Sequence, residues 1–506
     1  MAIKRYGASK DATIVNAFKA NLTTRGTGSN TGLSDIVEIF SIYGRESSGS
    51  QELSRFLMEF PIATVSSDRT SGILPASGSV SFYLRVFNAV HSKTVPRSFT
   101  LVASAVSQSW QEGIGLDLEN YKDETKGNEG VNWMSASNTS AWTNVGGDYL
   151  TGSGYLYSQD FSTGLEDIEI DITQLVEYWI DGTQTNYGIG VRLSSSYEAY
   201  HSSSTGQSSG SIIHNPDGAT TSYFTKRFFA SGSQYFFKRP VLEARWDDSV
   251  KDDRGNFYYS SSLAPAADNL NTVYLYNYIR GSLVNIPAVG TGSILLSLYS
   301  GSANNSAPSG SKLLLYNGGN NVTGGWVSTG IYSASVAITA AATPLTRLFD
   351  VWHSGSTEYA TGSITPEIIS AAQTVSKPTY YLNITNLKNS YRSDEIVRFN
   401  LYIRNKYWNP TIYTVAEISP DSTTISSASY SVYRTIDAFN AISYGTGSDL
   451  HTMMSHDVSG NYFDFDMRNL EPGYEYAFKF AFYDNGLNSW VEQSKAFKFR
   501  VEDYEY

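Results

Sequence analysis

The chain has 506 residues, more than one hydrophobic core usually organises, so we expect roughly two to four domains. Hydrophobic residues make up 41% and aromatic residues 14% of the chain, which excludes the disordered class. The formal net charge of −12, without any run of Lys and Arg, argues against direct nucleic-acid binding. Only 17% of the residues are charged and Tyr is abundant (37), a profile that favours half-buried strands over helices.

Cysteine is absent from the sequence, which is unusual for a secreted protein of this composition. The segment Met1-Ala-Ile-Lys-Arg-Tyr lacks the apolar core of a signal peptide, and no apolar run is long enough to span a membrane. We therefore expect a protein that folds in a reducing cytoplasm and stays soluble there unless lysis releases it.

Short strands dominate the expected structure of the first half. Residues 79–88 alternate apolar and polar side chains with a period close to two, and residues 99–106 behave likewise. Clusters rich in Gly, Ser and Asn, such as 25–32 and 194–211, separate these runs and predict turns and loops. The second cluster is almost purely polar and is expected to form a surface excursion.

One helix is predicted within this half, over residues 172–181. Asp171 can cap it, with Gln174 completing a capping box, and Gly182 can end it. Four apolar residues fall on one face and should plug the side or end of a sandwich. They are Ile172, Leu175, Val176 and Trp179.

The order of sequence elements over the first 250 or so residues resembles the DNRLRE-type domain, a jelly roll related in shape to carbohydrate-binding modules. That family is mostly found on secreted microbial proteins, whereas this chain shows no export signal. The matching elements are, in chain order, Asn30-Thr-Gly-Leu, Leu53-Ser-Arg-Phe-Leu-Met-Glu-Phe-Pro, 79–88, Val106-Ser-Gln-Ser-Trp-Gln-Glu-Gly, Val131-Asn-Trp, Ile170-Asp-Ile-Thr-Gln-Leu-Val-Glu-Tyr-Trp, Asn186-Tyr-Gly-Ile-Gly-Val, Phe228-Phe-Ala-Ser and Arg239-Pro-Val-Leu-Glu-Ala-Arg-Trp.

The whole chain also resembles virion structural proteins of contractile-tailed phages that infect marine cyanobacteria. The resemblance is carried by Met1-Ala-Ile-Lys-Arg-Tyr, by Asn21-Leu-Thr-Thr-Arg-Gly-Thr-Gly-Ser-Asn and by the strand expected over 35–43. It implies assembly in the host cytoplasm and a final location in the virion. A virion protein needs no signal peptide, which agrees with the missing export signal and the missing cysteines.

The expected architecture is all-β, with an N-terminal jelly-roll sandwich followed by one or two immunoglobulin- or fibronectin-like β-sandwiches. The turn-prone stretch 247–255 predicts the first domain boundary, and Ile364-Thr-Pro-Glu predicts a hinge. Leu470-Glu-Pro-Gly-Tyr-Glu-Tyr resembles the loop-and-tyrosine entry to a late strand of fibronectin type III domains. The predicted parts are an arm over 1–20, the jelly roll over 21–250, a sandwich over 256–365 and a fibronectin- or immunoglobulin-like sandwich over 366–506.

Catalytic and metal-binding motifs are missing from the sequence. His451 and His456 are the histidines most like ligands, but their spacing fits neither a helical pair nor a typical strand pair of a zinc site. No nucleophile elbow, Walker loop or dinucleotide motif occurs. The sequence therefore predicts no enzyme and no cofactor.

A structural Ca²⁺ is the one cation that the acidic residues suggest. Asp117, Glu119, Asp123 and Glu124 cluster, and Asp148 follows a pair of glycines. In a jelly roll such loops could hold a hard cation through carboxylate and carbonyl oxygens, although no EF-hand spacing is present. The alternative is a solvated loop on an acidic protein.

Aromatic residues beside polar loops are candidates for contacts with a glycan or a neighbouring subunit. Trp142 and Tyr149 flank one such loop, and Tyr197 and Tyr200 border the Ser-rich excursion. Packing in the core is the alternative, and the preferred one for most of the Trp residues.

Two functions remain open from the sequence. The first is a structural component of a tailed-phage virion (neck, tail, fibre or capsid decoration) that contacts other virion proteins and copies of itself in a symmetric oligomer. In that case the arm over 1–20 could reach onto a neighbour. The alternative is an adhesin that binds glycans of the host surface. A polysaccharide depolymerase would need a carboxylate cleft and usually a long β-helix, and the sequence shows no such repeat.

Overall fold

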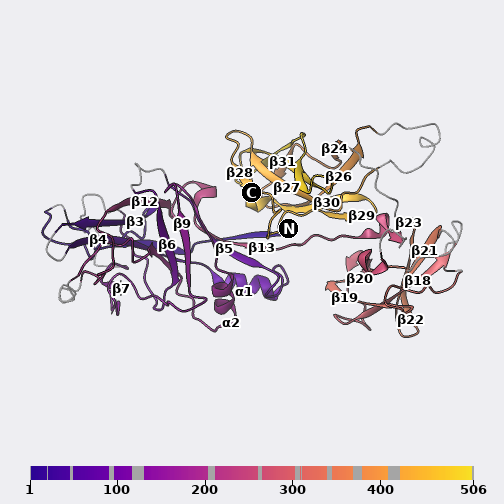
Figure 1. Cartoon of the computed structure of the whole chain (residues 1–506), viewed down its shortest axis with the longest axis horizontal. Coiled ribbons are helices and arrows are strands. Elements are labelled where there is room, and N and C mark those ends of the chain that lie inside the picture. Colours follow the sequence, from indigo (N-terminus) through magenta and orange to yellow (C-terminus); the bar gives the residue numbers. More distant parts are fainter. Residues whose placement is uncertain are drawn as a thin grey trace. The chain divides into compact units, whose positions relative to one another are not determined.

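The computed structural model describes residues 2–19, 21–45, 49–89, 96–116, 130–202, 211–259, 265–301, 308, 310–338, 345–368, 379–407 and 422–503. The chain forms two compact units, Ala2–Asp247 and Asp248–Tyr506, which divide within the charged stretch 247–255. Almost all of its regular elements are strands, as Figure 1 shows, so the chain belongs to the all-β class.

The first unit is a sandwich of two antiparallel sheets. One sheet has the strand order β1 (Ile3–Gly7), β13 (Val241–Arg245), β5 (Ser81–Val86) and β10 (Ile168–Asp171). The other has the order β12 (Tyr223–Phe229), β3 (Ile36–Gly44), β4 (Ser50–Glu59), β11 (Ile189–Leu193), β6 (Phe99–Ala105) and β9 (Leu156–Phe161), and β2 (Lys10–Val15) also pairs with β4. A small hairpin, β7 (Ser135–Ser137) and β8 (Ser140–Ala141), lies outside both sheets.

An apolar core fills the space between the two sheets. Strand β5 buries Phe82, Leu84 and Val86 and leaves the residues between them half-buried, which confirms the period of two expected there. From the seven-stranded sheet, Phe56 and Met58 of β4 pack into the same core. Burying one face of each sheet in this way is the main driving force for the sandwich.

The far face of the seven-stranded sheet carries a second core. Leu53 and Leu57 of β4 point to this side, where the loops between strands bring Trp110, Trp133 and Trp142 against them. Residues of a strand alternate between faces, so Arg55, which lies between the two leucines, also points into this second core.

Residues 2–15 correct the prediction of an N-terminal arm. Strand β1 pairs with β13, and β2 pairs with β4 from Lys10 to Val15. Ala12 and Ile14 of β2 are fully buried. The segment therefore belongs to both sheets of its own sandwich and does not form an extended arm.

Two α-helices occur among the described residues. The predicted helix is present as α2 (Thr173–Asp181), and Gly182 ends it in the left-handed conformation (φ +81°). The Asp171 carboxylate accepts from the N–H of Thr173 at the start of α2, as expected of a capping residue, but no hydrogen bond of Gln174 among the described residues completes a capping box. The sequence reasoning missed α1 (Ile62–Thr70), whose Arg69 forms a double hydrogen bond with Glu177 of α2.

The second unit begins with a sandwich made by one folded sheet. Strand β19 pairs with β18 over Val322–Gly324 and with β20 from Gly325 onward, so it passes from one half of the sheet to the other. The two halves enclose Val273, Leu296 and Trp352. The strand order is β15 (Asn271–Tyr276), β20 (Ile331–Val336), β19 (Val322–Ser328), β18 (Ile294–Gly301), β21 (Arg347–Ser354) and β22 (Thr357–Ile364). Two short pairs accompany it: β14 (Tyr258–Tyr259) with β23 (Glu367–Ile368), and β16 (Tyr278–Ile279) with β17 (Ser282–Leu283).

The last sandwich has an aromatic core in which Phe399, Phe463 and Phe478 contact one another. The Tyr476 hydroxyl donates to the carbonyl of Glu471 (2.8 Å), the tyrosine corner that the resemblance to fibronectin domains predicts. One sheet has the order β24 (Tyr380–Ile384), β26 (Ile396–Asn405), β30 (Gly460–Asp466) and β29 (Ser455–Asp457). The other has the order β25 (Ser390–Arg392), β33 (Phe497–Glu502), β31 (Glu475–Asp484), β27 (Ala428–Arg434) and β28 (Asn440–Ile442), and β32 (Ser489–Glu492) also pairs with β31.

Short 3₁₀ turns complete the regular structure, at Phe236–Lys238, Asp253–Asn256, Ala266–Asp268 and Met467–Asn469. In the part of the chain that the structure describes, no helix has the length and hydropathy required to cross a membrane.

Candidate functional site

A pocket of about 480 Å³ opens on the far face of the seven-stranded sheet, beside the second core. Strand β4 contributes Arg55 and strand β11 contributes Arg192, and residues within 143–151, 195–198 and 212–215, Glu198 among them, contribute the rest. Most of the side chains that line it are polar. The lining residues are Arg55, Thr143, Asn144, Val145, Gly147, Tyr149, Thr151, Arg192, Ser195, Glu198, Ile212, Ile213, His214 and Asn215.

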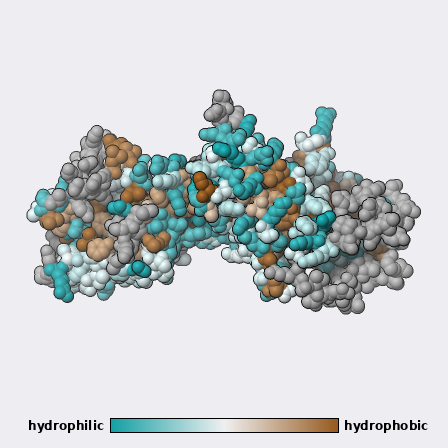
Figure 2. Space-filling model, turned by 90° about the horizontal axis from the view of Figure 1, so that it is seen from above, coloured by the Kyte–Doolittle hydropathy of each residue, from teal (hydrophilic) through white to brown (hydrophobic). Residues whose placement is uncertain are grey.

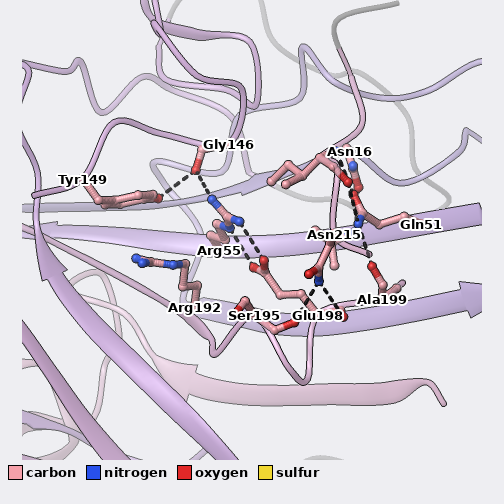
Figure 3. Close-up of polar contacts among 12 residues, drawn as sticks. Asn16, Gln51, Arg55, Gly146, Tyr149, Arg192, Ser195, Glu198, Ala199 and Asn215 are labelled. Atoms are coloured by element: carbon pink, nitrogen blue, oxygen red, sulfur yellow. Dashed lines mark hydrogen bonds and ion pairs between the residues drawn. The ribbon is translucent and has the colours of Figure 1, made fainter. Parts of the chain in front are cut away.

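Arg55 is a buried cation, and each of its three nitrogen atoms has a hydrogen-bond partner. Its Nε and Nη2 donate to the two carboxylate oxygens of Glu198 (2.9 and 2.8 Å), as Figure 3 shows. Its Nη1 donates to the carbonyl of Gly146 (3.0 Å), and the guanidinium lies 5.5 Å from the centre of the Trp133 ring. A buried ion pair is tolerated only when both partners are hydrogen-bonded in this way.

The ion pair with Glu198 stabilises the charged form of Arg55. Burial alone would lower the pKa of Arg55, but the charge of Glu198 and the hydrogen bonds to its carboxylate outweigh burial and raise it. Burial raises the pKa of Tyr149, whose hydroxyl donates to the carbonyl of Gly146 (2.8 Å). The ring of Tyr149 lies so close to Gly190 that a Cβ there would come within 2.1 Å of it, so β11 needs glycine at this position.

Arg192 is the second cation of the pocket, and its partners are different. It follows Gly190 by two residues on β11, so its side chain lies on the far face, where the Tyr149 ring packs against Gly190. Its Nη1 donates to the Ser104 hydroxyl (3.1 Å), and its guanidinium lies 4.6 Å from the centre of the Tyr149 ring. No carboxylate oxygen of the described residues lies within 4 Å of it. Burial and the nearby charge of Arg55 lower the pKa of Arg192.

Amide side chains fix the segment that carries Glu198. The Asn215 amide donates to the carbonyls of Ser195 (2.8 Å) and Glu198 (3.1 Å). The Gln51 amide donates to the carbonyl of Ala199 (2.8 Å), so β4 also holds this segment (Figure 3). The Glu198 carboxylate is therefore positioned by the backbone on both sides of it, and the pocket is preformed.

The predicted Ca²⁺ ligands do not form a site in the described part of the structure. Asp117, Glu119, Asp123 and Glu124 lie outside the described residues. The prediction of Asp148 as a Ca²⁺ ligand is wrong. One oxygen of its carboxylate accepts from the N–H of Thr143, and the other accepts from the N–H and the side-chain amide of Asn144. A carboxylate occupied by three N–H donors closes a turn and is not free to bind a cation.

The described residues also contain no cluster of histidines that could bind a metal ion. His456 lies 3.2 Å from a carboxylate oxygen of Asp253, and His451 is buried. Among the residues described, no three or more His, Cys, Asp or Glu side chains group as metal ligands do.

The structure places the four aromatic residues predicted to contact a glycan or a neighbouring subunit in different environments. Only Tyr149 lines the pocket. Trp142 is buried in the second core with its indole N–H donating to the carbonyl of Asn132, so its prediction as an exposed contact is wrong. Tyr197 packs edge-on against Tyr223, and Tyr200 packs edge-on against Tyr43.

Sequence reasoning did not assign Arg55, Arg192 or Glu198 to a site. The signal that could have found two of them is an arginine inside an apolar strand, as in Leu53-Ser-Arg-Phe-Leu and Ile189-Gly-Val-Arg-Leu. Arginine is rarely buried without a carboxylate partner, so such a position calls for one. The partner, Glu198, is more than 140 positions away from Arg55, and no local pattern indicates it.

Comparisons with known proteins do not place the chain in a family. No family model matches it, and no curated protein matches its sequence. Tandem immunoglobulin repeats of Dlar match at 9% identity over 41% of this chain and 82% of that one, with a TM-score of 0.13. The Ig1-2 module of the Drosophila receptor protein tyrosine phosphatase DLAR matches at 9% identity over 46% and 90%, also with a TM-score of 0.13. Salmonella alpha-2-macroglobulin matches at 8% identity over 99% of this chain and 34% of that one, with a TM-score of 0.14.

Proposed function

We propose that the chain is a non-catalytic structural component of a tailed-phage virion, at the neck, tail, fibre or capsid surface. It acts through contacts with other virion proteins and with copies of itself. The observation that carries the proposal is an exposed apolar patch on the middle sandwich. Clustered large apolar side chains on a protein surface mark contact sites for other proteins.

The patch gathers where the β16–β17 hairpin meets the end of β19. The Trp326 indole N–H donates to the Asn285 side chain (3.1 Å), and the N–H of Val284 donates to the carbonyl of Asn277 (3.0 Å), so these segments lie together. On the face that Figure 2 draws, hydrophobic residues lie in several groups among hydrophilic ones. The exposed side chains of the patch are Tyr278 (60%), Ile279 (45%), Val284 (37%), Trp326 (41%) and Val327 (43%).

Two further observations support the proposal. The resemblance of the N-terminal segments to virion proteins of cyanobacterial phages points to the particle, and so does the lack of cysteine. Rigid β-sandwiches in series are also suited to assembly, because each presents a preformed surface at little cost in conformational entropy.

Electron cryo-microscopy of intact particles tests the proposal directly. We expect ordered density at a neck, tail, fibre or capsid position into which the three sandwiches fit. We also expect the double substitution Tyr278→Ser with Trp326→Ser to reduce incorporation into particles, measured by mass spectrometry of purified virions. Tyr407→Ser, which changes another exposed tyrosine (77%), is the matched control. Particles that lack the chain would overturn the proposal.

Saccharide binding is the second candidate, and the preformed polar pocket favours it. Pockets of this size hold small ligands, and hydroxyl and amide side chains such as those of Asn144, Thr151 and Ser195 match sugar hydroxyl groups. Ser195 is exposed at the pocket, so Ser195→Trp should fill the entrance and abolish binding on a glycan array. Ser196→Trp is the control, because Ser196 is equally exposed but does not line the pocket. An array without signal for the folded wild-type protein would remove this candidate.

A further inference from the structure

The pocket holds more positive than negative charge. Among its lining residues, Arg55 and Arg192 are cationic and Glu198 is the one carboxylate. Both oxygens of Glu198 are engaged by Arg55, so they offer little to a second guanidinium. His214 is the other lining residue that can carry a charge, and it too would add positive charge when protonated.

Arg192 has donors to spare. A guanidinium has five N–H groups, and one hydrogen bond of Arg192, to Ser104, is formed within the described structure. The stacking on Tyr149 holds the plane of the group without using these donors. A partly buried guanidinium without a carboxylate is unfavourable unless something of opposite charge binds to it.

We propose that the pocket binds an acidic sugar and that Arg192 recognises its anionic group, a carboxylate or a sulfate ester. This inference rests on the saccharide-binding candidate and adds the ligand class and the residue that selects it. Arginine suits the role because its planar fork can donate two parallel hydrogen bonds to an oxyanion.

The charge pattern and the lining chemistry together favour a sugar over a simple anion. A lone anion needs few partners, whereas Thr151, Ser195 and Asn144 line the same pocket as Arg192, and their side chains can bind hydroxyl groups. Glu198 forms its hydrogen bonds with Arg55 and acts on Arg192 through its charge alone.

Isothermal titration calorimetry with three probes tests the proposal on the full chain. The probes are trigalacturonic acid, its methyl ester and a sulfated galactan oligosaccharide. We expect at least one acidic probe to bind and the neutral ester not to bind. Arg192→Gln should weaken the acidic probe roughly 10- to 100-fold, because it removes a charge-assisted pair. Arg192→Lys should keep part of the affinity, since it keeps the charge and loses the fork.

Arg227→Gln is the matched control, because it removes the same charge from a partly exposed arginine (43%) of the same sandwich that pairs with Glu38 outside the pocket. Circular dichroism checks that each variant is folded. The two acidic probes tell a carboxylate ligand from a sulfate ligand, and binding of either one supports the proposal.

Two outcomes overturn the inference in distinguishable ways. Equal binding of the neutral ester, unchanged in Arg192→Gln, would leave saccharide binding standing and remove the acidic class. No binding of any of the three probes, together with an empty glycan array, would remove both.

Discussion

The two faces of the seven-stranded sheet bury charge in different ways. On the far face, Arg55 is paired in full with Glu198, and its pKa is raised. On the face toward the main core, Lys226 lies on the same side as Ile39, and Asp11 lies on the same side as Met58. Neither has an ion-pair partner within 4 Å in the described residues. Burial favours the uncharged form of each, so it lowers the pKa of Lys226 and raises the pKa of Asp11.

The shifts on the core side are large enough to matter near physiological pH. Burial lowers the pKa of Lys226 from 10.5 to about 8, against the opposing charges of Asp167 and Glu166. Burial raises the pKa of Asp11 from 3.8 to about 6, although the Ser231 N–H donates to it. The comparison teaches that an ion-pair partner stabilises the charged form of a buried group, whereas burial without such a partner destabilises it, and three substitutions test this.

The largest effect is expected for Glu198→Leu. It leaves Arg55 as an unpaired buried cation, and we expect a loss of about 3–5 kcal/mol in the free energy of unfolding. The double variant Arg55→Met with Glu198→Leu should recover most of the loss, because it buries no charge. Calorimetric unfolding of the four proteins completes the cycle.

Glu492→Leu is the control for that cycle, because its pair with Lys479 is exposed and should contribute less than about 1 kcal/mol. If Glu198→Leu lowered the free energy of unfolding as little as Glu492→Leu, the Arg55–Glu198 pair would not be important for the stability of the far face.

An effect of opposite sign is expected for Lys226→Met. The side chain is buried between the rings of Phe161 and Phe228, where methionine fits and carries no charge. We expect the variant to be about 1–2 kcal/mol more stable at pH 7. The folded-state pKa lies below the unfolded value, so the cost is complete below pH 8 and disappears as the pH rises to 10.5.

The advantage of Lys226→Met should therefore shrink between pH 8 and pH 10.5, measured by denaturant unfolding of both proteins across that range. A variant less stable than the wild type would show that the hydrogen bond from Lys226 to Asn88 outweighs burial of the charge.

The smallest effect is expected for Asp11→Asn, about 1 kcal/mol in favour of the variant at pH 7. Asparagine keeps an acceptor for the Ser231 N–H and carries no charge. The folded-state pKa of Asp11 lies above its unfolded value, so the wild type loses stability as the pH rises from 3.8 to 6. Thermal melts at pH 4 and pH 7 should show the variant gaining over the wild type at pH 7 alone. An equal difference at both pH values would contradict a raised pKa.

Local patterns in the sequence were sufficient for much of the secondary structure. The period of two in β5 and the left-handed Gly182 at the end of α2 follow from residues next to one another. The tyrosine corner at Tyr476 was also predictable, because its partner is the carbonyl of Glu471, five positions earlier. Helix α1 escaped because Ile-Ala-Thr-Val-Ser-Ser-Asp-Arg-Thr is rich in β-branched and hydroxyl side chains, and its packing on α2 overrides that preference.

By itself, the sequence determined the all-β class and the alternation that builds each sheet, because burial of one face of a strand is a property of neighbouring residues. The tertiary structure alone decided the site. Arg55 and Glu198 are 143 positions apart in the sequence. The positive charge of Arg192 is left without a hydrogen-bonded carboxylate because both oxygens of Glu198 accept from Arg55. It also decided that residues 2–15 are strands of the sandwich and not an arm, since a strand is fixed by the partner it pairs with, and that partner lies far along the chain.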